Sequence, residues 1–101
     1  MQEVKSYSII FYGGPDGYQS NRAQIQLHGD EKKALAWVRF SDPGTAPKED
    51  SNVGGTIRMH LPSTMFQSVL DVLRNEKPVF IRFVQKRGFL STAQELVGEG
   101  E

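Results

Sequence analysis

Arginine and aromatic residues alternate at three places in the chain, and this spacing is the pattern best suited to ligand binding. The three pairs are Trp37 with Arg39, Arg58 with His60, and Phe80 with Arg82. Each pair is two residues apart, and residues with that spacing project from the same face of a β-strand. If the three strands share one sheet with aligned registers, the six side chains form one candidate binding face.

This predicted face has the parts of a single-stranded nucleic-acid platform, in which guanidinium groups meet phosphates and aromatic rings stack on bases. Twelve basic residues balance twelve acidic ones, however, so the formal net charge is zero. Nucleic-acid affinity depends largely on phosphate neutralisation, and a solvated sheet face carries long polar side chains in any case. We therefore expect Arg82 to face solvent or a partner chain, and we keep nucleic acid as the alternative.

The sequence lacks the usual patterns of a catalytic or cofactor site. There is no cysteine, which excludes disulfides and thiolate chemistry. His28 and Asp30, in "HGD", supply two possible metal ligands, which is fewer than a metal site needs. The segment "GGPDGYQSNR" lacks the lysine and the following helix of a phosphate-binding loop. We expect no enzyme activity, no metal and no cofactor.

The elements that position these side chains follow from hydrophobic alternation. Segments rich in β-branched and aromatic residues predict strands at 6–12, 23–28, 34–40, 56–61, 78–84 and 88–93. The short connections "GDEKK" and "QKRG" predict two hairpins. The residues predicted to face inward include Ile25, Leu27, Ile57, Met59 and Leu61.

One helix is predicted over "PSTMFQSVLDVLRNEKP", with Ser63 or Thr64 as its cap and Pro78 beyond its end. Its buried stripe has the three-and-four spacing of a helix face. This stripe comprises Phe66, Val69, Leu70 and Leu73. The order β-β-β-β-α-β-β predicts an α+β fold, with one antiparallel sheet or half-barrel of about six strands and the helix packed on one face.

Length and composition predict one domain of residues 1–101, since 38% of the residues are hydrophobic. Proline, glycine, aspartate and serine predict a mobile loop near 41–55, and the last residues predict a short acidic C-terminal tail. No apolar segment approaches the ~20 residues that span a bilayer, and the first residues carry no signal-peptide pattern. We expect no membrane association and a cytoplasmic location.

The predicted strands 34–40 and 78–84 are apolar on both faces, so a single covering helix leaves one side without cover. Curling of the sheet or a second subunit supplies that cover, and two-fold association also pairs exposed strand edges. The preferred interpretation is a non-catalytic binding module that acts through protein contacts as a homodimer. Single-stranded nucleic-acid binding is the alternative. A small-molecule pocket lined by Phe66, Trp37 and Tyr12 is a third possibility.

Overall fold

The structure is a computed structural model that describes residues 2–93, and the predicted acidic tail lies outside them. Within this range the chain forms eight strands, an α-helix and two short 3₁₀ turns. The strands are β1 (Gln2–Val4), β2 (Ser6–Phe11), β3 (Asn21–His28), β4 (Ala34–Ser41), β5 (Ser51–Val53), β6 (Thr56–Pro62), β7 (Val79–Val84) and β8 (Arg87–Thr92). The helix α1 spans Phe66–Asn75, and the 3₁₀ turns span Asp30–Lys32 and Ser63–Met65. The predicted α+β class is confirmed.

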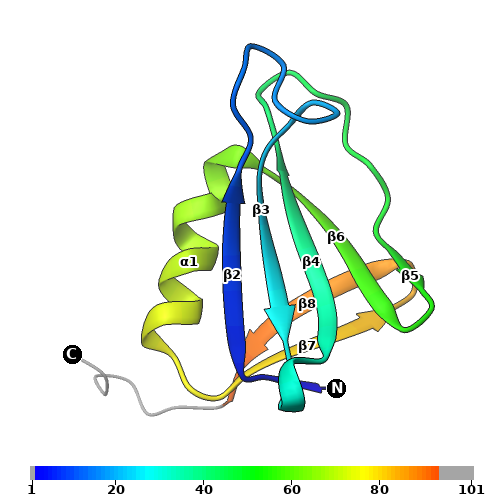
Figure 1. Cartoon of the computed structure of the whole chain (residues 1–101). Helices are drawn as coiled ribbons and strands as arrows, with labels where there is room; N and C mark the ends of the chain where they lie inside the picture. Colours follow the sequence, from blue (N-terminus) through cyan, green and yellow to red (C-terminus); the bar gives the residue numbers. More distant parts are fainter. Residues whose placement is uncertain (1, 94–101) are drawn as a thin grey trace.

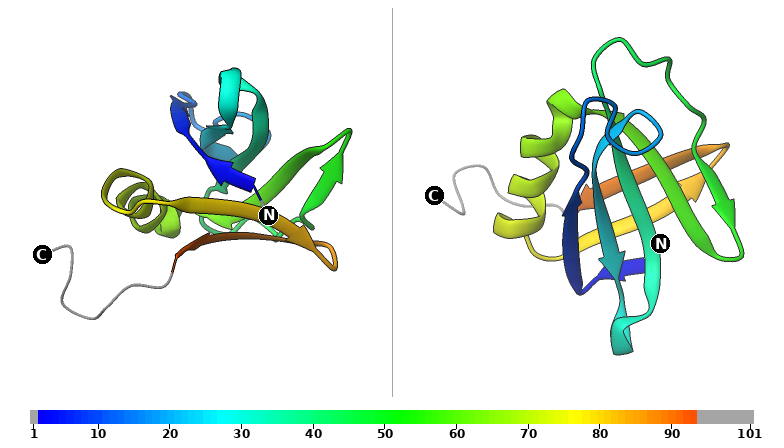
Figure 2. Two further views of the ribbon diagram at one scale, coloured as in Figure 1. Left: turned by 90° about the horizontal axis from the view of Figure 1, so that it is seen from below. Right: turned by 45° about the horizontal axis from the view of Figure 1, so that its top comes forward.

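The strands form two sheets and not the single sheet that alternation predicted. A five-stranded sheet has the order β2-β3-β4-β6-β5, and a three-stranded sheet has the order β1-β7-β8. The two predicted hairpins are present, because β3 pairs with β4 and β7 with β8, both antiparallel. β4 and β6 run parallel. The strands of the two sheets cross at a steep angle, one layer over the other (Figures 1 and 2).

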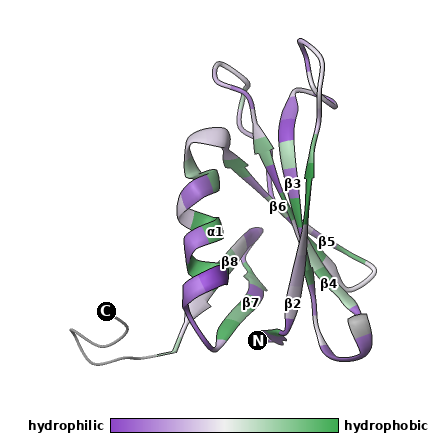
Figure 3. Ribbon diagram, turned by 60° about the vertical axis from the view of Figure 1, so that its left-hand side comes forward, coloured by the Kyte–Doolittle hydropathy of each residue, from purple (hydrophilic) through white to green (hydrophobic). Residues whose placement is uncertain are grey.

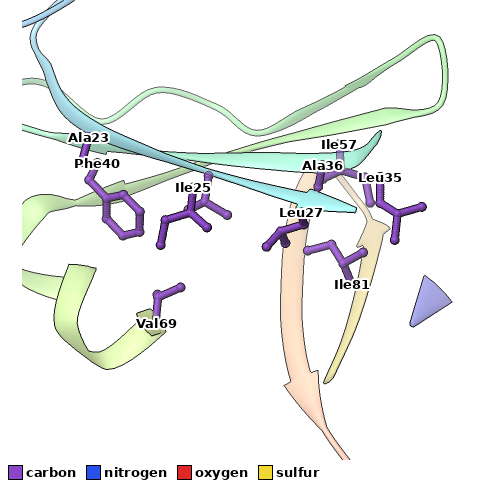
Figure 4. Packing of buried hydrophobic residues seen from close by; sticks show 10 residues of the cluster. Ala23, Ile25, Leu27, Leu35, Ala36, Phe40, Ile57, Val69 and Ile81 are labelled. Atoms are coloured by element: carbon purple, nitrogen blue, oxygen red, sulfur yellow. The ribbon is translucent and has the colours of Figure 1, made fainter. Parts of the chain in front are cut away.

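The core lies between the two sheets. Side chains of inward parity from both layers point into this space (Figure 4). The residues with 0% exposure include Ile25, Leu27, Val38, Phe40 and Ile81. Met59 and Leu61 are partly buried against this cluster, so the predicted inward parity of β3 and β6 is confirmed.

The helix α1 stands beside the three-stranded sheet and turns its hydrophobic side toward the sheets (Figure 3). The ring of Phe66 lies 5.0 Å from that of Phe40 and 5.2 Å from that of Phe11, measured between centroids. Val69 is buried and Phe66 and Leu73 pack against the core, so three of the four residues of the predicted stripe face it, and Leu70 is only half-buried. The predicted cap is corrected, since a 3₁₀ turn precedes α1 and no side-chain hydrogen bond caps either element.

Asp50 joins the two sheets at the side where β6 and β8 approach each other. Its Oδ1 accepts a hydrogen bond of 2.8 Å from the backbone N–H of His60, and its Oδ2 accepts one of 2.9 Å from that of Gly88. Asp42, nearer β4, forms an ion pair with Arg22 at 2.9 Å. The stretch 41–55 therefore contains a strand, β5, and two anchoring carboxylates. The predicted mobility of this stretch stays a prediction.

Candidate binding face

Four of the six residues in the predicted face come together on the outer side of the five-stranded sheet. Trp37 and Arg39 project from β4, and Arg58 and His60 project from β6. The parallel register places Trp37 opposite Arg58, and Arg39 opposite His60. We call these four side chains the Trp37 cluster. The neighbours of Trp37 and Arg39 along β4 are buried in the core, so the alternation of β4 keeps the cluster outside. These neighbours are Ala36, Val38 and Phe40.

The indole of Trp37 is the centre of the cluster. The guanidinium carbon of Arg39 lies 4.1 Å from the indole centroid, and that of Arg58 lies 5.6 Å from it. Both distances fall within the range of a cation–π attraction. The ring of His60 meets the indole edge-on, with 5.6 Å between centroids and an interplanar angle of 84°. Arg39 Nε also donates to Gln24 Oε1 at 2.9 Å, which fixes the guanidinium on the sheet.

The two arginines of the cluster have no carboxylate partner among residues 2–93. The ion pairs in that range are Lys5 with Glu3 and Arg22 with Asp42. Arg58 is exposed and Arg39 is half-buried. Their positive charges therefore remain available to an anionic ligand, although the net charge of the whole chain is zero.

His60 is the titratable member of the cluster. Burial lowers the pKa of His60 below its usual value of 6.5. The negative charge of Asp50 opposes this effect, and the positive charges of Lys48, Arg39 and Arg58 add to it. The imidazole is therefore mostly uncharged at neutral pH, and the charge of the cluster comes from the arginines.

Two tyrosines that the sequence analysis did not assign to the face extend it. The Tyr18 ring lies 5.5 Å from the guanidinium carbon of Arg39 and 5.2 Å from the ring of Tyr12. The hydroxyl of Tyr12 donates to Gln24 Oε1 at 3.2 Å, so Gln24 holds both Tyr12 and Arg39. Tyr18 is 47% exposed. It lies in the connection between β2 and β3, where alternation along a strand gives no signal.

The structure does not bring Phe80 and Arg82 to this face, because β7 belongs to the other sheet. On β7 the neighbours Val79 and Ile81 point into the core, so Phe80 and Arg82 point outward on the opposite side of the molecule. Arg82 is exposed, and its guanidinium carbon lies 5.0 Å from the ring centroid of Phe89. The predicted six-residue face is therefore corrected to four residues on one sheet and two on the other.

The third possibility, a pocket lined by Phe66, Trp37 and Tyr12, does not form. Trp37 and Tyr12 lie on the outer side of the five-stranded sheet, whereas Phe66 packs on Phe40 at its inner side. A different hollow of about 240 Å³ lies beside α1. Its lining is almost entirely apolar and includes Met59, Leu61, Met65, Val72 and Leu90.

The "HGD" segment gains no third metal ligand in the part of the chain that the structure describes, where no three histidine, aspartate or glutamate side chains gather. Within the same residues, no helix is long and apolar enough to cross a membrane.

Comparison of the chain with protein-family models, with curated proteins and with solved structures finds no match in any of the three.

Proposed function

We propose that this protein is a non-catalytic binding module and that its Trp37 cluster, together with Tyr12 and Tyr18, binds single-stranded nucleic acid. One observation carries the proposal: two arginines flank the indole of Trp37 on a solvated sheet face, and neither has an acidic partner among residues 2–93. Aromatic rings interleaved with arginine in this way suit a polymer that is both anionic and rich in planar bases.

Each part of the cluster matches one part of such a ligand. Arg58 is exposed and suits a backbone phosphate. Arg39 lies over the indole, so a base stacks on the outer side of its guanidinium plane or displaces it from the ring. The exposed Tyr18 ring offers a second stacking surface at the far end of the same row.

The zero net charge of the chain is compatible with this proposal and limits its strength. Asp42 lies near the face, but its carboxylate is neutralised by Arg22. Two arginines neutralise about two phosphates. For a single strand, a plot of the logarithm of the binding constant against the logarithm of the salt concentration should then have a slope of about −1.4. We expect weak binding that salt reverses.

Trp37 provides the test, because it is the only tryptophan in the 101-residue chain. At low salt, binding should raise the fluorescence anisotropy of a labelled oligonucleotide and should quench the fluorescence of Trp37. Added salt should reverse both signals. Trp37→Ala removes the ring over which Arg39 lies and to which a base gains access if it displaces Arg39, so it should weaken binding by up to about 1–3 kcal/mol, the contribution of one stacked base. Arg39→Ala combined with Arg58→Ala should weaken binding and reduce the salt dependence.

Arg82→Ala is the matched control, since Arg82 also stacks on an aromatic ring but lies on the other sheet. This variant should bind the oligonucleotide as the wild type does. Unchanged anisotropy at high micromolar protein would rule out the proposal, and so would an equal loss of affinity in Arg82→Ala.

Self-association is a second candidate, favoured by the outer side of the three-stranded sheet. Phe80 and Phe89 are only half-buried there, and Val84 is 43% exposed. No other helix or strand of residues 2–93 lies over the outer side of β7 and β8 (Figure 2). On β4, by contrast, Ala36, Val38 and Phe40 are fully buried in the core. The outer side of β7 and β8 therefore remains the surface that a second copy would cover.

Sedimentation of the intact chain tests this second candidate. A homodimer has twice the mass of the 11.3 kDa chain. Phe89→Ser combined with Val84→Thr should return it to a monomer, and Trp37→Ala on the opposite face should leave the dimer intact. A wild-type monomer at high concentration would remove the candidate.

A further inference from the structure

A small hollow lies directly beside the Trp37 cluster, between β4, β6 and the chain that connects β4 to β5. Its volume is about 130 Å³. The lining includes Ser41, Thr45, Pro47, Lys48, His60 and Pro62. Most of this lining is apolar, but four of its residues, Ser41, Thr45, Lys48 and His60, carry hydroxyl, ammonium or imidazole groups of the kind that bind phosphate.

The donors in this hollow are only weakly engaged by the protein. Lys48 is exposed, and its Nζ is 3.5 Å from the carbonyl oxygen of Gln19. The Ser41 hydroxyl lies 3.5 Å from the carbonyl oxygen of Leu61. Both distances are at the outer limit of a hydrogen bond, so both groups can turn to a ligand with better geometry.

His60 connects the hollow to the stacking surface. Its ring lines the hollow and also meets the edge of the Trp37 indole. A strand lying on the cluster therefore passes the mouth of the hollow. The negative charge of Asp50 acts on His60, but both of its carboxylate oxygens already accept backbone N–H groups, and Glu49 is exposed.

The charge of a phosphate group depends on its position in the strand. A terminal phosphomonoester carries about −1.5 to −2 charges at neutral pH and three acceptor oxygens. It therefore matches several converging donors better than an internal phosphodiester with a single charge does.

We propose that this hollow binds the terminal phosphate of a strand whose bases lie on the Trp37 cluster, so that the protein prefers phosphorylated strand ends. The inference rests on the proposed nucleic-acid function and adds an end preference to it. The phosphate sits against Lys48, with the hydroxyls of Ser41 and Thr45 as further donors.

The test uses three forms of one short, internally labelled oligonucleotide. The first carries a 5′-phosphate, the second carries a 3′-phosphate, and the third has hydroxyls at both ends. One phosphorylated form should bind about fivefold more tightly than the hydroxyl form, which is the strength of a favourable exposed ion pair. Lys48→Gln should abolish this difference and leave affinity for the hydroxyl form unchanged. Lys86→Gln, which removes a lysine from the turn between β7 and β8, is the matched control and should keep the difference.

The possible outcomes distinguish the preference for phosphorylated ends from nucleic-acid binding itself. Equal affinity for all three oligonucleotides overturns the end preference and leaves the nucleic-acid function standing. Absence of any binding overturns both. Competition by inorganic phosphate shows whether the group is recognised apart from the strand. If inorganic phosphate binds through Lys48 while phosphorylated strands gain nothing, the hollow is a free-phosphate site and the proposal fails.

Discussion

The carboxylate of Asp50 satisfies one backbone amide in each sheet, that of His60 on β6 and that of Gly88 on β8. Neither amide has a strand partner at that position, because β5 begins after Asp50 and β8 is the edge of its sheet. The two oxygens of one side chain therefore replace two missing ladder hydrogen bonds. No short segment of sequence reveals this role, since Gly88 is 38 residues away.

Asp50→Asn should destabilise the fold. The amide keeps one acceptor but directs an N–H group toward one of the two backbone N–H groups. A half-buried donor without a partner costs about 1–3 kcal/mol, and we expect the free energy of unfolding in urea to fall by that amount. Glu49→Gln, at the exposed neighbouring position, should change it by less than about 0.5 kcal/mol. Equal midpoints for the two variants would show that Asp50 does not join the sheets.

His60 makes stability depend on pH in a defined direction. Its pKa is lowered below 6.5 in the folded chain, chiefly by burial, whereas the unfolded chain has the ordinary value of about 6.5. As the pH falls below that value, the unfolded chain takes up the proton first. The contribution of His60 to stability is therefore complete above about pH 6.5 and declines below it, toward the folded pKa.

NMR titration and urea unfolding test this expectation together. The chain has two histidines, so the imidazole resonance lost in His60→Gln identifies His60. Its midpoint should lie below 6.5 in the folded protein. The loss of stability on going from pH 7 to pH 5.5 should be smaller in His60→Gln than in the wild type. A midpoint above 6.5 would mean that Asp50 outweighs burial and the charges of Lys48, Arg39 and Arg58.

At the scale of elements, local sequence predicted most of the secondary structure. The six predicted strands correspond to β2, β3, β4, β6, β7 and β8, and the predicted helix corresponds to α1. The two strands that were missed, β1 and β5, have three residues each. Segments that short carry no periodicity, and they are strands only because β7 and β6 lie beside them.

Pairing between strands is the part that local sequence did not supply. Alternation groups residues that share one face of a strand, but it contains no information on which strands share a sheet. Trp37 and Arg58 meet because β4 and β6 are parallel neighbours in register. Phe80 and Arg82 have the same local pattern and lie on the opposite face. The sequence therefore predicted that arginine and aromatic residues form a face, but it did not predict which of these residues lie together in the Trp37 cluster.

The turn between β7 and β8 contains two residues with positive φ that are not glycine, Gln85 at 52° and Lys86 at 63°. This is the conformation of a two-residue hairpin turn, in which glycine is strongly preferred at the second position. Other L-residues adopt that region at a cost of about 1–2 kcal/mol. The turn "QKRG" lacks the Asn-Gly pair that usually marks such a hairpin. The hairpin forms nevertheless, because β7 and β8 pair along their whole length.

Lys86→Gly should stabilise the protein. Glycine removes the cost of the left-handed conformation, and part of this gain is offset by about 0.5–1 kcal/mol of extra freedom in the unfolded chain. We expect a net gain of about 0.5–1 kcal/mol in urea unfolding. Lys86→Ala, which removes the same side chain and keeps the strain, should give no gain. Equal stabilisation by both variants would attribute the effect to the lysine charge instead.

At the scale of the whole molecule, two sheets packed face to face present two outer faces that point in opposite directions (Figure 2). One carries the Trp37 cluster and the other carries Phe80, Arg82 and Phe89. A closely packed core separates the two faces, with Ile25 on β3 and Ile81 on β7 both fully buried. If two copies associate through the three-stranded sheets, both Trp37 clusters therefore remain on the outside.

The two proposed activities should then be independent. Phe89→Ser should abolish self-association and leave the affinity for a short oligonucleotide unchanged, whereas Trp37→Ala should do the reverse. In the double variant the two effects should add to within about 0.5 kcal/mol, as expected for distant sites with no shared partner. The oligonucleotide must be short, because a strand that reaches both copies would gain affinity from the dimer itself. A loss of short-oligonucleotide affinity in Phe89→Ser would show that the ligand contacts both sheets, and that the binding surface runs around the edge of the sandwich.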